Sequence, residues 1–130
     1  MREIRFTQYA NAGELAKERV VFRAYEDLLI GDYAVFASPI NNKGEVLSGT
    51  QAAFWFPDDD ISNGDLVVLY TKTGTAKQKD LTAGRRAHFY YWGLNEPQWA
   101  SGKNSAVLVE VSGWEHSPPP SFSGFGETDE

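Results

Sequence analysis

The sequence predicts a single all-β domain, arranged as a β-sandwich or a β-barrel. Short runs rich in Val, Ile, Phe, Tyr and Trp recur along the chain, as in strands with at least one buried face. Gly, Asn, Asp and Pro separate these runs at intervals of about ten to fifteen residues, a spacing typical of sandwiches and barrels. Evidence for helices is thin, so the pattern does not indicate βαβ units.

Seven segments carry the strand signal. Ile4, Phe6 and Gln8 alternate with their neighbours in the first of them. Segment 51–56 contains three aromatic residues and ends at Pro57. Segment 66–71 is nearly all apolar, which suits a strand covered on both faces. The predicted strands are 4–9, 19–24, 33–37, 51–56, 66–71, 87–92 and 106–111.

Three segments depart from this pattern. Asn11 followed by Glu14 resembles a helix capping box, but Gly13 in the first turn limits any helix to a turn or two. Segment 72–86 is basic and has little apolar anchoring, so we expect a solvated, mobile loop. Segment 117–130 is rich in Pro, Gly, Ser and acidic residues, which predicts a flexible tail after a sandwich domain at 1–116.

Composition excludes several classes of protein. The chain has 130 residues, enough for one core, and no Cys, which excludes disulfides, thiol catalysis and cysteine-based metal centres. No apolar run approaches the ~18 residues of a membrane helix, and the charged start lacks the pattern of a signal peptide. We therefore expect a cytoplasmic protein without a membrane partner. The net charge of −6 argues against strong, nonspecific nucleic-acid binding.

The sequence contains no complete motif of catalytic residues. An apolar run leads into segment 72–75 (Lys-Thr-Gly-Thr), as in the phosphorylation motif of ion-pumping ATPases, but Thr71 stands where that chemistry needs an Asp. Ser112-Gly113 lacks the Gly-x-Ser-x-Gly elbow of serine hydrolases, and no glycine-rich phosphate loop is present. We expect a non-enzyme that uses no cofactor. An unrecognised hydrolase is the alternative, because active sites on sandwiches need not carry readable motifs.

The acidic segment 58–65 is a weak candidate for an adventitious calcium site. Asp58, Asp60 and Ser62 fall at positions one, three and five of a calcium-binding loop. Gly64 then falls at position seven instead of six, and Leu69 replaces the Glu required at position twelve. A turn whose side chains cap backbone amides is the simpler interpretation, and no metal site is expected elsewhere.

Two clusters of side chains are candidate binding residues. The first is aromatic and could stack on a sugar or a base, although core packing is the competing interpretation: Tyr90, Trp92 and Trp99. The second is basic and could contact nucleic-acid phosphates: Lys77, Lys79, Arg85 and Arg86.

The order of these signals resembles the lamin tail domain, a fold unit of nuclear lamins and of many bacterial proteins. The most specific stretch is Tyr91-Trp92-Gly93, followed by Trp99 and by segment 105–109 (Ser-Ala-Val-Leu-Val). These are similar to the family's Tyr-Trp-Gly, Trp-Asn-Asn and Ala-x-Leu segments. Earlier parts of the pattern are segments 18–23, 29–33, 56–57 and 63–70. The resemblance covers about residues 15–114 of the chain.

This resemblance implies an immunoglobulin-like antiparallel β-sandwich. The family shares no catalytic residues, and its members serve as attachment or interaction modules. We therefore expect a non-enzymatic interaction module that binds a protein partner or assembles with itself, with Trp99, Phe122 and Phe125 as anchors. One alternative is a sandwich that binds carbohydrate or another small ligand through the aromatic cluster. The other is an accessory nucleic-acid contact through the basic segment 72–86.

Overall fold

The computed structural model describes residues 3–49, 51–100 and 102–120, and it confirms the all-β prediction. The described strands are β1 (Ile4–Ala10), β2 (Arg19–Ala24), β3 (Leu28–Leu29), β4 (Tyr33–Pro39), β5 (Ala52–Trp55), β6 (Asp60–Ile61), β7 (Leu66–Tyr70), β8 (Lys77–Asp80), β9 (Arg86–Tyr91) and β10 (Asn104–Glu110). Two short 3₁₀ turns, η1 (Ile30–Asp32) and η2 (Thr82–Gly84), are the helical elements in this part of the chain. None of its helices is long and apolar enough to cross a membrane.

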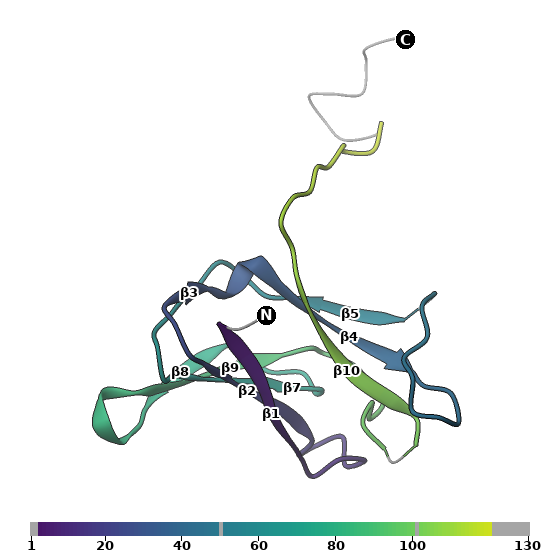
Figure 1. The fold of residues 1–130 in the computed structure, drawn as a ribbon, viewed down its shortest axis with the longest axis horizontal. Helices are drawn as coiled ribbons and strands as arrows, with labels where there is room; N and C mark the ends of the chain where they lie inside the picture. The colour runs from purple at the N-terminus through teal and green to yellow at the C-terminus, as the bar shows by residue number, and fades with distance from the viewer. Residues whose placement is uncertain (1–2, 50, 101, 121–130) are drawn as a thin grey trace.

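The strands form two layers (Figure 1). One layer is a five-stranded sheet in the order β1-β2-β7-β9-β8, and the other is a three-stranded sheet in the order β10-β4-β5. The short pair of β3 and β6 lies at one end of the sandwich. Beyond β10 the chain leaves the two layers as an extended segment, which Figure 1 draws in yellow-green.

The strand β8 corrects the prediction of a solvated loop over 72–86. Its residues pair antiparallel with β9, from Lys77 opposite Phe89 to Asp80 opposite Arg86. All four β8 side chains are exposed, so no apolar alternation marks this strand in the sequence. Strand β9 lies between β7 and β8. Its ladder with β7 is parallel, whereas the other ladders of the described strands are antiparallel.

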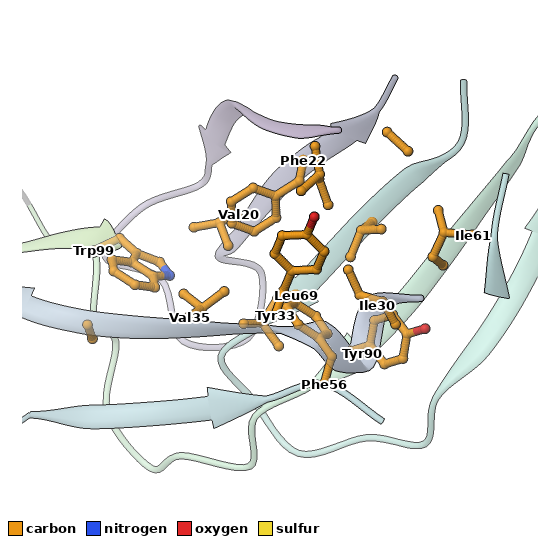
Figure 2. Close-up of a cluster of buried hydrophobic side chains, with 14 residues drawn as sticks. Val20, Phe22, Ile30, Tyr33, Val35, Phe56, Ile61, Leu69, Tyr90 and Trp99 are labelled. Carbon is orange, nitrogen blue, oxygen red and sulfur yellow. The ribbon is translucent and has the colours of Figure 1, made fainter. Parts of the chain in front are cut away.

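The core fills the space between the two sheets (Figure 2). Alternate residues of β2 and β7, such as Val20, Phe22 and Leu69, meet Tyr33 and Val35 of β4 there. The side chains between them in sequence point away from the core, on the outer face of each sheet. Each sheet therefore has an inner face in the core and an outer face that points away from it.

The segment between β1 and β2 contains turns in place of the expected short helix. The Glu14 carbonyl accepts hydrogen bonds from the N–H groups of Lys17 and Glu18, and Asn11 has a positive φ of 53°. The side chain that reaches back to a backbone amide is Glu18, which accepts from the Gly13 N–H at 2.9 Å. The capping-box pattern therefore pointed to Glu14, whereas the glutamate that accepts a backbone N–H in this segment is Glu18.

Candidate binding surfaces

The buried carboxylate of Glu18 ties three loops together. It is fully buried and accepts hydrogen bonds from the Thr71 hydroxyl and from the N–H groups of Gly13, Gln98 and Trp99. These donors come from the β1–β2 turns, the end of β7 and the loop before β10. Buried charges persist where such donors replace lost water. Glu18 is therefore a structural residue.

A second buried pair, Asp65 and His88, fixes the turn before β7. His88 Nε2 lies 2.8 Å from Asp65 Oδ2, and both side chains are almost fully buried. Burial raises the pKa of the Asp65 carboxyl, but hydrogen bonds from His88 and from the N–H groups of Ser62 and Arg86 outweigh burial and hold this pKa below its usual value. Among the described residues His88 hydrogen-bonds only to Asp65, which suits a structural tie.

The calcium candidates do not converge on one point. The Asp58 carboxylate lies against the backbone of Gly31, so that a Cβ added at Gly31 would clash with it. Asp60 pairs with Leu29 in the β3–β6 ladder, and its exposed side chain faces another pocket, beside Ser62. Within the described residues no group of three His, Asp or Glu side chains could hold a metal ion.

The predicted aromatic cluster lies in or against the core. Tyr90 is 3% exposed and Trp99 is 4% exposed, and Trp92 packs beside them. The Tyr90 hydroxyl donates to Asp59 at 2.8 Å, and burial together with this acceptor raises the pKa of Tyr90. Tyr90 and Trp99 therefore offer no free ring face to a sugar or a base, which corrects that expectation. The same burial removes Trp99 as a partner anchor, and Phe122 and Phe125 lie outside the described residues.

The basic candidates occupy different environments on the β8–β9 hairpin. Lys77 and Lys79 are exposed on β8. Arg86 is bound to Asp80 at 3.1 Å and to Gln78 at 3.0 Å, so its charge is partly engaged. Arg85 is half-buried, and its side chain packs against Gly64. The two lysines are thus the better placed of the four to meet a partner.

The outer face of the three-stranded sheet carries no charged side chain along the described strands, and we refer to it as the apolar face. The strand register places Ala34, Trp55 and Val109 side by side on it, next to Phe36 and its neighbours. In most antiparallel sheets the outer face is polar. The full set of residues on this face is Ala34, Phe36, Ser38, Ala53, Trp55, Ser105, Val107 and Val109.

One end of the apolar face is formed by two exposed tryptophans. Trp55 is 49% exposed and Trp114 is 65% exposed, and their rings meet edge to face with centroids 5.2 Å apart. The Trp55 indole donates to the Gly31 carbonyl at 2.8 Å, which fixes its orientation. A groove of about 330 Å³ beside the rings is lined by both of them and by Asp32 and Asp58. We call it the tryptophan groove.

The outer face of the five-stranded sheet has the opposite character, and we refer to it as the basic face. Its strand positions include no Asp or Glu among the described residues. Its cationic side chains are Arg5, Arg19, Arg23, Lys72, Lys77 and Lys79. Its aromatic side chains are Tyr70, Phe89 and Tyr91, which lie side by side on the central strands.

Sequence reasoning missed the exposed aromatics of both faces. A period-two signal was present, because Trp55 stands between the inward-facing Phe54 and Phe56. Tyr70, Phe89 and Tyr91 likewise alternate with the inward-facing residues Leu69, His88 and Tyr90. Which of the two alternating sets faces the core depends on the packing of the two sheets, and local sequence does not contain that information.

Comparison with known proteins gives no match: no protein-family model fits the chain, and no curated protein and no solved structure is detectably similar to it. The resemblance to lamin tail domains therefore stays a prediction, and function has to be argued from the two outer faces.

Proposed function

We propose that this protein is a non-enzymatic interaction module that binds a protein partner on its apolar face. The observation that carries the proposal is the pair of exposed tryptophans on a sheet face without charged side chains. Tryptophan is enriched at the centres of protein interfaces, because its large ring loses little conformational entropy when it is buried. The resemblance to lamin tail domains, which serve as interaction modules, points in the same direction.

The tryptophan groove indicates the chemistry of the partner. The exposed side chains of Asp32 and Asp58 flank the two indole rings, and neither carboxylate has a hydrogen-bond or ion-pair partner among the described residues. A Lys or Arg would be attracted both to the carboxylates and to the electron-rich ring faces. We therefore expect a docking segment in which a basic residue stands beside apolar ones.

Site-specific crosslinking tests this proposal. A photo-crosslinking amino acid is placed at Ala53, which is exposed on the apolar face, and at Ala16, which is exposed in the β1–β2 turns. In a lysate of the source organism, we expect a discrete protein adduct from position 53 and none from position 16. Replacing Trp55 and Trp114 by Ala should abolish the adduct, because the indole contacts are lost.

The mass of the adduct distinguishes the two forms of the proposal. An adduct of twice the mass of the chain would indicate self-assembly through the apolar face, and any other discrete mass a different protein. Replacing the exposed Tyr25, which lies over Arg5 on the other sheet, is the matched control and should leave the adduct unchanged. Equal adducts from positions 53 and 16, or none from position 53, would contradict the proposal.

A further inference from the structure

We propose that the basic face binds single-stranded nucleic acid, an activity beyond the protein contact proposed for the opposite sheet. The ligand would lie across β2, β7, β9 and β8, with phosphates on the cationic side chains and a base against the aromatic ones. Three observations support this: the segregation of charge, the groove between β8 and the aromatic residues, and the fixed positions of two cations.

Charge is strongly segregated in this molecule. Half of the twelve Lys and Arg residues lie on the basic face, although the chain as a whole carries a net charge of −6. The acidic side chains near Trp55, Asp32 and Asp58, lie in the segments that flank the opposite sheet. The net charge therefore understates the local positive potential that a phosphate chain would meet over the five-stranded sheet.

A groove on this face places aromatic rings beside lysines. It encloses about 430 Å³ and is lined by Tyr70, Phe89 and Tyr91 on one side and by Lys77 and Lys79 on the other. Phe89 lies directly opposite Lys77 in the β8–β9 ladder. Sheets that bind single strands combine the same two elements, rings for the bases and cations for the backbone. Duplex bases are already stacked and would not reach these rings.

Two cations are held in place before any ligand arrives. The Arg19 guanidinium lies 5.6 Å from the centre of the Tyr70 ring, and the Lys72 ammonium lies 5.2 Å from it. Tyr70 in turn stacks on Tyr91 at 5.2 Å with an interplanar angle of 12°. Since these rings are engaged with one another and with cations, Phe89 is the ring best placed to stack on a base. Arg19 and Lys72, which both lie over the Tyr70 ring, would contact phosphates next to that base.

Fluorescence anisotropy with a labelled single strand of about fifteen thymidines or uridines tests the proposal at about 50 mM salt. We expect saturable binding that weakens steeply as salt is raised. The double charge reversal Lys77→Glu/Lys79→Glu should weaken binding by roughly tenfold or more, because two phosphate contacts become repulsive. The matched reversal of two exposed lysines away from this face, Lys43→Glu/Lys103→Glu, should change the affinity by less than about twofold.

Phe89→Leu separates base stacking from charge. Leu keeps an apolar side chain in the groove but removes the ring, so the affinity for the single strand should fall by roughly fivefold. Unlabelled duplex of the same length and inorganic polyphosphate should compete poorly. No binding of the single strand would overturn the proposal. Equal competition by polyphosphate together with unchanged binding by the Phe89 variant would also overturn it, because the face would then recognise anions without regard to bases.

Discussion

The carboxylate of Glu18 is the clearest case of one side chain that organises distant segments. Four donors from three loops converge on it in a fully buried position. Glu18→Gln replaces one acceptor oxygen by an amide that faces donors, so we expect the free energy of unfolding to fall by about 3 kcal/mol. Urea denaturation measures this change. Glu14→Gln, at an exposed position, should stay within about 0.5 kcal/mol of wild type, and equal effects of both changes would refute the role of Glu18.

Asp65 makes stability depend on pH on the acid side. Its pKa in the folded state lies below the ordinary value of 3.8, so the unfolded chain binds the proton first. The contribution is therefore complete above pH 3.8 and is lost as the pH falls through the folded-state pKa. Asp65→Asn should be less stable at neutral pH and should lose less stability between about pH 5 and pH 2. Asp60→Asn, at an exposed position, is the control. The account would be contradicted if Asp65→Asn lost as much stability on acidification as the wild-type protein.

Residue identity alone did not reveal which polar residues would be buried. Glu18 and His88 look like ordinary strand-end residues in the sequence, yet both are buried. Their partners are remote in sequence, since Glu18 binds the amides of Gln98 and Trp99 and His88 binds Asp65. Such pairs form only when the topology brings the segments together. The exposure of Trp55 was not predicted either, because a large aromatic residue in a strand is normally expected in the core.

At the scale of elements, local pattern located the strands that contribute side chains to the core. The predicted segments at 19–24 and 66–71 correspond closely to β2 and β7. The exceptions are β8, whose side chains are all exposed, and the two-residue strands β3 and β6. Strands β3 and β6 are short and pair with each other although they are far apart in the sequence. Strand β8 pairs with the neighbouring β9 and exposes all its side chains. Neither situation produces a signal in hydrophobic periodicity.

The connection from β7 to β8 depends on one glycine. At Gly74 the backbone passes so close to the Tyr91 ring that an added Cβ would lie 2.4 Å from a ring carbon. Gly74→Ala should therefore push the connection away from β9 and reduce the free energy of unfolding by about 1–3 kcal/mol. Thermal or urea unfolding gives the value. A Cβ at Gly113 would have nothing within 4 Å, so Gly113→Ala is the control and should have little effect. If Gly74→Ala were as stable as wild type, the contact between Gly74 and Tyr91 would not constrain the connection.

At the scale of the whole molecule, the two sheets share one core but present outer faces of opposite chemistry. Composition and strand spacing predicted the all-β class and the absence of long helices. They did not predict the faces, because net charge and aromatic content are averages over the chain. Among the predicted binding residues that the structure describes, Lys77 and Lys79 remain well placed, whereas the aromatic candidates Tyr90 and Trp99 are buried.

The central claim is that the apolar face binds a protein and the basic face binds nucleic acid. Affinity capture with three baits in parallel tests it most directly: wild type, Trp55→Ala/Trp114→Ala and Lys77→Glu/Lys79→Glu. Bound protein and bound nucleic acid are quantified separately for each bait. We predict that the tryptophan variant loses the captured protein but keeps the nucleic acid, and that the lysine variant does the reverse. Loss of both ligands from both variants, or of neither ligand from either, would contradict the existence of two independent binding faces.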